Sequence, residues 1–570
     1  VALAQDTVKG TVSDDDGQPI PGATVVLKGT STATTADFDG NFSINVGLGD
    51  VLVVSYVGYS SAEVTVDSSN LSITLQSATK LDEVIVTSYG ETQKKKSAAS
   101  TQRITSETIE NRPNASIIQT LTGQVAGLDI FTNSGQPGAN SLIELRGSNS
   151  INGNTEPLIL LDGTPIDEDE FSQLNPNEIE SLDVLKDAGG TAIYGNRGAN
   201  GVILIKTKRG EFNSPLKIKV NSSYAVSQYQ DSDYDMMNAS ELLAIEKELN
   251  RGYGATLTDE EIANFGPGYD WKDFFYQDGK TENHNVTITS GGAKSSQLTS
   301  LGYFEQEGIT ITTKLQRFNL RNNFNTRSDD GKFKLASSLS LNFAKTNIRG
   351  SEGSSGINRN IQFGPLYAAP YVLPSDYIDD VSAFGADKGF NVFQITPLIL
   401  MDLAKKTVRK DEDIKAIYNL DISYDLLDNL TFRSVSGVDY SGINNLYAEP
   451  SDQWSAVYFE DANNTGLAGF QDYDQTNILA INQTTSVTWN TTIADDHNIT
   501  AAGYLEYFKA HYKTFGYRNR GLNPKTYYPG DGSAYIADNS ANDSFSNSVN
   551  ANLLDAGLFS YCASLDYDFK

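Results

Sequence analysis

The 570-residue sequence is poor in the residues that build metal centres and covalent cross-links. Its single cysteine, Cys562, excludes an internal disulfide and a cage of thiolate ligands. Its three histidines, His284, His497 and His511, are separated along the chain and have no evident partners, so a histidine-rich metal site is not expected. We therefore expect no metal site and no cofactor.

Positive charge and long apolar runs are also scarce. The chain has 43 Lys and Arg against 72 Asp and Glu, which gives a net charge of −29. This argues against a nucleic-acid partner, because binding to phosphates needs a basic face. No run of 18 or more apolar residues is present, so no helix is expected to span a bilayer. A secreted all-β protein and a transmembrane β-barrel both remain possible, because barrel strands alternate and give a weak hydropathy signal.

Familiar catalytic motifs are absent from the sequence. It contains no G-x-S-x-G, no phosphate-binding G-x-x-x-x-G-K-[ST], no H-E-x-x-H and no C-x-x-C. The acidic runs 167–170 and 411–413 lack the spaced ligands of a calcium loop, and we interpret them as solvated loop acids. We therefore predict no catalytic residues and no enzymatic activity.

The first residues carry a possible export signal. Ala2-Leu3-Ala4 fits the small-x-small end of a secretory signal peptide, although a frayed terminus would look the same. We predict a signal-peptide remnant over 1–4, a cleaved signal peptide and a mature chain that starts at Gln5.

Short β-prone runs separated by turn residues follow over residues 7–76, with Asp39-Gly40 as one hairpin turn. This spacing predicts a β-sandwich domain over residues 5–78. The string Gly17-x-Pro19-x-Pro21-Gly22-Ala23 resembles the carboxypeptidase regulatory-like domain, which implies an accessory module without catalytic residues.

Residues 79–98 form a linker that contains a brief β-prone run. The run Asp82–Thr87 lies between a finished sandwich and a new domain, so we expect it to have no sheet of its own to join. Such a strand can add to the edge of a partner's sheet through main-chain hydrogen bonds. The alternative is a plain linker that happens to contain a few valines.

The segment 99–211 reads as a small α/β domain. Asn175-Pro176-Asn177 predicts the start of a short helix, with Ile179, Leu182 and Leu185 on one face. The apolar run 202–205 predicts a buried strand. Glycines at 195, 198 and 201 indicate close backbone packing. The most distinctive strings contain the residues Arg146, Gly147, Asp162, Gly163, Tyr194, Gly195, Arg197 and Gly198.

In their order, these strings resemble the plug domain of SusC-like TonB-dependent outer-membrane transporters, the SusC/RagA family, and the resemblance runs from about residue 7 to the end of the chain. The resemblance implies that the plug blocks the lumen of a barrel. It also makes the run in the linker the TonB box, which a periplasmic TonB protein grips: Asp82, Glu83, Val84, Ile85, Val86 and Thr87. The sequence departs from the family pattern at Ala188-Gly189-Gly190 and at Ser88.

The resemblance further implies the function. It implies import of a bulky nutrient, a glycan or a peptide, across the outer membrane of a Bacteroidota-type bacterium, with a SusD-like surface lipoprotein as a lid. The alternatives are a surface binding or signalling receptor on the same scaffold, and a metal-chelate (siderophore) transporter without a lid.

Residues 212–570 show the alternation of barrel strands, in which one face meets lipid and the other the lumen. Apolar and polar residues alternate over 333–343, 416–426 and 559–569. We count about ten such strands, whereas plugged transporters have about 22. Open edges cannot face lipid. We therefore predict a mainly β chain with an N-terminal sandwich, a plug and a partial, truncated or incomplete antiparallel transmembrane β-barrel. The barrel-assembly machinery or another partner would then hold its open edge.

Long segments between the strands are expected to be extracellular loops, at about 347–412, 442–474 and 512–556. The second contains Tyr447, Trp454 and Tyr458, which we take as candidate substrate contacts because aromatic rings stack on apolar faces of ligands. The alternative is that these rings pack against one another. The segment 231–280 is interpreted as structural, with a helix over 239–249.

Overall fold

The computed structural model describes most of the chain between residues 6 and 569. The residues outside the description are 1–5, 15–16, 29, 31, 48, 57–58, 60–61, 76–83, 88–89, 94–100, 111–115, 133, 140, 149, 152, 231–235, 350–358, 362, 382–383, 385–389, 392–393, 461–467, 495, 523–527, 530–546 and 570. The predicted signal-peptide remnant lies among them.

The chain divides into two compact units, Val1–Ala98 and Ala99–Lys570. The first contains two small sheets of order β4-β1-β7 and β3-β2-β5-β6. Alternate residues of their strands, such as Phe42, Ile44 and Val46, are buried in one shared core, which confirms the sandwich. The strands are β1 (Asp6–Asp14), β2 (Thr24–Leu27), β3 (Ala33–Thr35), β4 (Asn41–Val46), β5 (Val51–Ser55), β6 (Ala62–Thr65) and β7 (Asn70–Leu75).

The linker strand is paired within the chain. Strand β8 (Val84–Thr87) forms an antiparallel hairpin with β9 (Gly90–Gln93), in which Thr87 lies opposite Gly90. The expectation that this run has no strand to join is therefore wrong, because the residues directly after it supply one. Asp82 and Glu83 lie outside the described residues.

In the second unit, a five-stranded mixed sheet of order β10-β15-β16-β13-β14 forms the plug. A separate hairpin, β11-β12, and short helices cover it, and their apolar side chains, such as Ile117, Phe171 and Leu182, share one core. The elements are β10 (Thr101–Thr105), α1 (Ser106–Glu110), α2 (Ile117–Thr120), β11 (Leu128–Thr132), β12 (Ser141–Leu145), β13 (Leu158–Leu161), β14 (Thr164–Ile166), α3 (Glu168–Gln173), η3 (Pro176–Glu178), β15 (Ile179–Leu185), α4 (Ala188–Thr191), η4 (Ala192–Gly198) and β16 (Val202–Thr207).

The predicted helix after Asn175 is wrong beyond its first turn. Asn175 caps a single 3-10 turn, η3, and residues 179–185 continue as strand β15. This strand lies between β10 and β16, and nearly all its residues are buried. A strand covered on both faces is apolar at most positions, so a spacing of three among its apolar residues does not identify a helix. The predicted buried strand at 202–205 is confirmed as part of β16.

Gly201 is required where β16 begins. Its φ is +94°, and a Cβ there would lie 2.2 Å from Cδ2 of Leu145 and 3.2 Å from the carbonyl oxygen of Leu185. We expect Gly201→Ala to lower the free energy of unfolding of the plug by about 1–3 kcal/mol. Gly189→Ala is the matched control, because a Cβ at Gly189 in α4 meets nothing within 4 Å. Urea unfolding monitored on the plug tests this, and equal midpoints for the two variants would contradict it.

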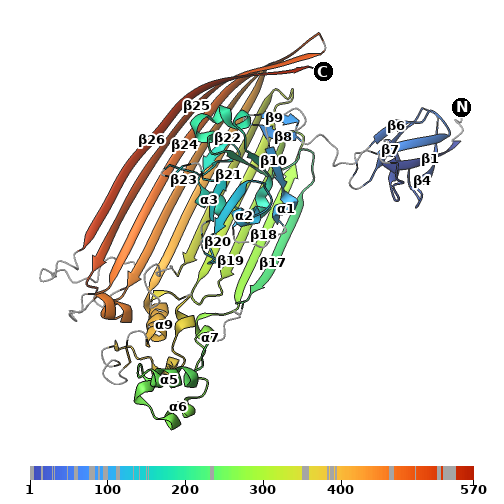
Figure 1. Ribbon diagram of the computed structural model, residues 1–570. Coiled ribbons are helices and arrows are strands. Elements are labelled where there is room, and N and C mark those ends of the chain that lie inside the picture. Colours follow the sequence, from blue (N-terminus) through green and yellow to red (C-terminus); the bar gives the residue numbers. More distant parts are fainter. Residues whose placement is uncertain are drawn as a thin grey trace. The chain divides into compact units, whose positions relative to one another are not determined.

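The rest of the second unit is one antiparallel sheet of ten strands in sequence order, β17 to β26, which curves around the plug (Figure 1). Among the described strands, β17 pairs only with β18 and β26 only with β25, so both edges of the sheet are open. The strands are β17 (Lys217–Ser227), β18 (Gly279–Gly291), β19 (Ser295–Glu307), β20 (Lys314–Arg327), β21 (Phe333–Asn347), β22 (Val408–Leu427), β23 (Leu430–Glu449), β24 (Phe470–Ile493), β25 (His497–Arg520) and β26 (Ser548–Phe569).

The two faces of the sheet have opposite chemistry. In β21, Ser338, Ser340 and Asn342 are buried towards the plug, whereas Leu341 and Phe343 are 38% and 45% exposed on the outer face. This confirms the predicted alternation and gives the partial barrel an apolar exterior and a polar interior. No helix in the described part of the chain is long and apolar enough to cross a membrane.

All four long connections lie at the same end of the sheet, because consecutive strands are antiparallel (Figure 1). They are residues 228–278, 348–407, 450–469 and 521–547, and they contain α5 (Ala239–Glu248), α6 (Asp259–Phe265), α7 (Lys272–Phe275) and α9 (Thr396–Lys406). Our loop bounds were too wide, since 408–412, 442–449, 470–474 and 512–520 belong to strands. The predicted helix at 239–249 is confirmed as α5.

Candidate functional site

The plug is attached to the inner face of the sheet by buried ionic contacts. Arg321 of β20 has no exposed surface, and its Nε donates to Oε2 of Glu178 at 2.8 Å. Its Nη1 lies 3.7 Å from Oδ2 of Asp162, whose side chain is 1% exposed. One guanidinium of the barrel therefore neutralises two carboxylates of the plug in a region that excludes water.

Neutral hydrogen bonds extend this attachment along β20 and β22. Nδ2 of Asn323 donates to the carbonyl oxygen of Lys208 at 2.6 Å and to Oγ1 of Thr207 at 3.0 Å. Thr164 donates to Asn419, which in turn donates to the carbonyl oxygen of Leu161 at 3.3 Å. The turn between β13 and β14 is thus held directly against the wall of the barrel.

The residues of the distinctive plug strings have structural positions in this arrangement. Arg146 and Asp162 both have positive φ, 62° and 48°, and each is followed by a glycine that also has positive φ, Gly147 and Gly163. Asp162 accepts hydrogen bonds from the backbone and hydroxyl of Thr207 at 3.1 and 2.6 Å. The strings therefore mark tight turns at the ends of the plug strands.

The later strings, which contain Tyr194, Gly195, Arg197 and Gly198, contact the sheet near its other edge, at strand β25. Tyr194 is buried, and Gly195 has a φ of 57° inside η4. Arg197 forms an ion pair with Glu506 of β25, and its guanidinium lies 5.5 Å from the ring centre of Phe508. A Cβ at Gly198 would lie 2.7 Å from the carbonyl oxygen of Thr191. Arg197 thus links the plug to a strand far from Arg321.

A cavity of about 780 Å³ lies between the plug and the inner wall of the sheet. A cavity of this size can hold a ligand as large as a drug molecule or a short piece of an oligomer. Amides, hydroxyls and charged groups dominate its lining, which includes Gln119, Gln173, Arg317, Asp413, Lys415 and Asn445, and none of the described residues that line it is aromatic. The arrangement can hold a polar ligand with several hydrogen-bonding groups and both signs of charge.

The acidic runs contribute to this interior, and our interpretation of them as solvated loop acids is wrong for Asp169, Glu170, Asp411 and Asp413, although the side chains of Asp167 and Glu412 are 45% and 42% exposed. Asp411 and Asp413 lie on β22 and line the cavity, as does Asp169 of α3. Glu170 has no exposed surface. The spacing of Asp411, Asp413 and Lys415 by two residues places them on one face of a strand, and this signal was available in the sequence.

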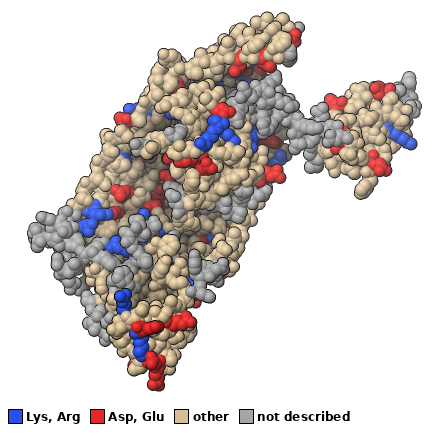
Figure 2. All heavy atoms as spheres, viewed as in Figure 1, with Lys and Arg blue, Asp and Glu red and all other residues tan. Residues whose placement is uncertain are grey.

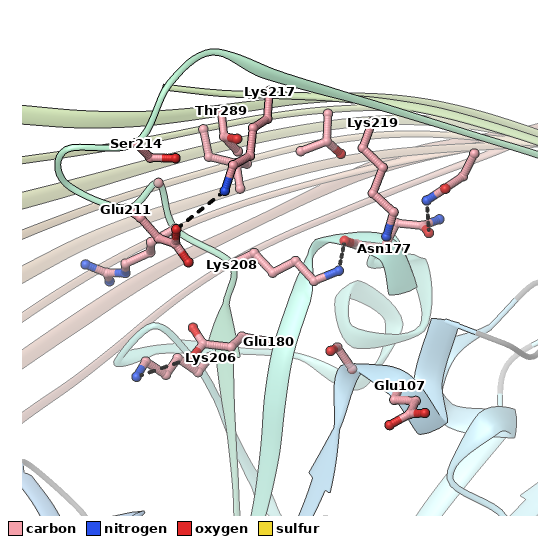
Figure 3. A pocket seen from close by; sticks show the side chains of 16 residues that line it. Glu107, Asn177, Glu180, Lys206, Lys208, Glu211, Ser214, Lys217, Lys219 and Thr289 are labelled. Atoms are coloured by element: carbon pink, nitrogen blue, oxygen red, sulfur yellow. Dashed lines mark hydrogen bonds and ion pairs between the residues drawn. The ribbon is translucent and has the colours of Figure 1, made fainter. Parts of the chain in front are cut away.

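A second cavity, of about 900 Å³, lies between the plug and the open edge at β17 (Figure 3). Lys217 lies 3.7 Å from Glu211, Lys206 lies 3.7 Å from Glu180, and Lys208 donates to the carbonyl oxygen of Asn177 at 2.7 Å. Because the cations of this cavity have partners of their own, we assign it no ligand.

On the surface of the molecule, acidic and basic side chains gather over the plug and around α5 and α6 (Figure 2).

The structure gives the three predicted substrate contacts different surroundings. Trp454 has no exposed surface and stacks on Tyr377, with ring centres 5.4 Å apart, inside a core that the long loops share. It is not accessible to a ligand, which corrects its assignment as a substrate contact. Tyr447 lies on β23, where its hydroxyl donates to Glu449, and Tyr458 is half-buried in η9 (Ala456–Glu460). The last two stay predictions.

The chain matches two protein-family models. Residues 8–86 match the CarboxypepD_reg-like domain, and residues 93–202 match the TonB-dependent Receptor Plug Domain. Among curated proteins, TonB-dependent receptor P26 of Formosa agariphila is 30% identical over 511 residues, which are 89% of this chain and 49% of that protein. TonB-dependent receptor SusC of Bacteroides thetaiotaomicron is 37% identical over 327 residues, 56% of this chain and 32% of that protein.

This chain belongs to the SusC-like TonB-dependent receptors. The RagAB peptide importer in its open-open state has the same fold, with a TM-score of 0.72 at 24% identity over 85% of this chain and 55% of that one. The SusC-like chain described here spans about half the length, or less, of the curated relatives it matches. Its location is the bacterial outer membrane, where the apolar outer face of the ten-stranded sheet meets lipid.

Proposed function

We propose that this SusC-like protein takes part in TonB-dependent import of a bulky nutrient across the outer membrane. The observation that supports this most strongly is the plug, attached by buried polar contacts to the inner face of a transmembrane sheet. A plug attached in this way closes the lumen at rest and must be displaced before cargo passes. The relatives are receptors of the TonB-dependent class, and we propose no enzymatic activity.

The proposal assigns roles to two protein partners. A periplasmic TonB protein would bind residues 82–87, which include strand β8 (Val84–Thr87), and transmit energy to the plug. A SusD-like surface lipoprotein would cover the end of the sheet where the long loops form their own core. Because the loop helices lie beyond the strand ends, they offer a folded surface for such a lid (Figure 1).

A glycan or a peptide is the proposed cargo, and the interior cavity favours the peptide. Sugar rings are usually bound by stacking on aromatic side chains, and the described part of the cavity lining has none. Its amides match the main chain of a peptide, and Asp413 and Arg317 match charged side chains or termini. The solved relative named a peptide importer agrees with this choice.

Uptake by a deletion strain tests the proposal. Cells that lack the gene, and cells that carry it again on a plasmid, are given labelled oligopeptides and labelled oligosaccharides in parallel. We expect the deletion to lower peptide accumulation to background and the plasmid to restore it. Restored surface binding without accumulation would favour the receptor alternative, and restored accumulation of ferric chelates alone would favour the siderophore alternative.

A further inference from the structure

Two carboxyl groups meet without a donor between them where the plug contacts β23. Glu170 of α3 is 0% exposed and Asp439 of β23 is 7% exposed. The two side chains are within hydrogen-bonding reach of each other. Neither carboxylate oxygen of Glu170, nor Oδ1 of Asp439, accepts a hydrogen bond from any donor in the described part of the chain. Ionised carboxylates are acceptors only, so this contact lacks a proton.

The surrounding charges do not compensate for the pair. The cation that faces it is Lys415 of β22, which is 1% exposed and whose Nζ lies 3.2 Å from Oδ1 of Asp167. That same oxygen also caps helix α3 by accepting from the backbone N–H of Glu170 at 2.6 Å. The acids around Lys415 outnumber it: Asp167, Asp169, Glu170, Asp413 and Asp439.

Burial decides the protonation state of Glu170. Removal from water, and then the neighbouring Asp439, raise the pKa of Glu170 well above its usual range. An ionised carboxylate in a dry site without a partner costs several kcal/mol, so the group keeps its proton instead. A proton on Glu170 also supplies the missing donor to Asp439.

We propose that Glu170 and Asp439 form a proton-dependent latch that holds the plug against the barrel. In the closed latch the Glu170 carboxylic acid donates its proton to a carboxylate oxygen of Asp439. Loss of that proton to water leaves two adjacent buried carboxylates, which repel each other across the plug–barrel contact. Because Asp169, Asp413 and Lys415 line the neighbouring cavity, water in that cavity is the route by which the proton leaves.

The sign of the pH dependence follows from the raised pKa. The latch contributes its full stability below the ordinary glutamate pKa and loses it as the pH rises through the higher pKa of the folded state. Between these two pKa values, plug opening increases by up to about tenfold per pH unit for one proton, and it levels off above the higher one. Glu168 of the same helix also has a pKa raised to about 7, mainly by burial. Its titration must therefore be eliminated by substitution before the pH dependence of Glu170 is measured.

Two measurements on the purified full chain in detergent test the latch, both in a Glu168→Gln background. The first is the infrared band of a protonated carboxylic acid at neutral pH, which ionised surface acids do not give. We expect this band in the background protein and its loss in Glu170→Gln. The second is amide hydrogen exchange of α3 and β14, measured from the ordinary glutamate pKa up into the alkaline range and corrected for the intrinsic rate. We expect opening to increase with pH in the background protein.

The variants separate a proton latch from simple packing. Glu170→Gln keeps the shape of the side chain and a donor, so opening should stay low and independent of pH. Asp439→Asn removes the repulsion but leaves Glu170 buried, so its pH dependence should be weaker than that of the background without being lost. Glu180→Gln, at a plug carboxylate that is 47% exposed, should keep the pH dependence of the background. Absence of the infrared band, or an unchanged pH slope in Glu170→Gln, would overturn the latch. Neither measurement depends on transport. The latch can therefore be confirmed or overturned whether or not the proposed import function is correct.

Discussion

Removal of residues 82–87 is expected to reduce uptake of cargo to background while leaving binding of cargo at the cell surface unchanged. The reason is mechanical, since a partner that adds its own strand to β8 (Val84–Thr87) holds it through main-chain hydrogen bonds, and without that strand no force reaches the plug. Replacement of the six residues by a Gly-Ser linker of equal length keeps the tether itself. Accumulation of labelled cargo in whole cells, compared with binding of the same cargo to ice-chilled cells, checks this.

The hairpin allows a sharper version of this experiment. Thr87 pairs with Gly90 across a two-residue loop, so the N–H groups of residues 85 and 87 point to β9 and those of 84 and 86 point to the free edge. Val86→Pro removes a donor from the free edge and is expected to reduce uptake as strongly as the deletion. Ile85→Pro, the matched control, removes a donor that serves the hairpin and should retain most uptake. The reverse order would show that the partner displaces β9.

Arg321→Met is expected to weaken the attachment of the plug to the sheet by about 3–5 kcal/mol, because it leaves Glu178 buried without its cation. Arg433→Met is the matched control, since it removes a guanidinium from another barrel strand. Its ion pair with Asp421 is 38% and 23% exposed and is expected to contribute less than about 1 kcal/mol. Hydrogen exchange of η3 and β15 measures how often the plug detaches from the sheet. Entry of large antibiotics into cells measures how often the lumen is open.

A second variant shows that the loss comes from the unpaired carboxylate. Arg321→Met combined with Glu178→Met replaces both partners by apolar side chains of similar length, and we expect it to recover much of the lost stability. Asp162 keeps its hydrogen bonds from Thr207 in this double variant. If Arg321→Met and Arg433→Met had equal effects, the buried contact would not be the main attachment of the plug.

The alternation of the barrel strands was readable because each face of such a strand meets one environment. Leu341 and Phe343 point to lipid and Ser340 and Asn342 to the plug, so the period of two survives in the sequence. The same logic failed at 179–185, where both faces of β15 are buried and the pattern loses its period. For the run 411–413 the period of two placed Asp411 and Asp413 on one face of a strand, but it did not say whether that face meets bulk water or a buried plug.

Only the contacts between distant segments decided the candidate site. Trp454 is as aromatic in sequence as Tyr447, yet the loop core buries it against Tyr377, about which local sequence says nothing. The pairing of β8 with β9 is a local contact, by contrast, and it changed the linker strand from an isolated run into one half of a hairpin.

The sequence by itself determined the order of sandwich, plug and barrel strands, because turn glycines and strand periodicity are local properties of the chain. The turns at Arg146-Gly147 and Asp162-Gly163, in which the residue before each glycine also has positive φ, were seen only in the structure. The tertiary structure alone decided that Arg321 meets Glu178, that Glu170 meets Asp439, and that a polar cavity lies beside them. These contacts join residues more than a hundred positions apart, and the electrostatics of each group depend on burial that only the assembled plug and barrel create.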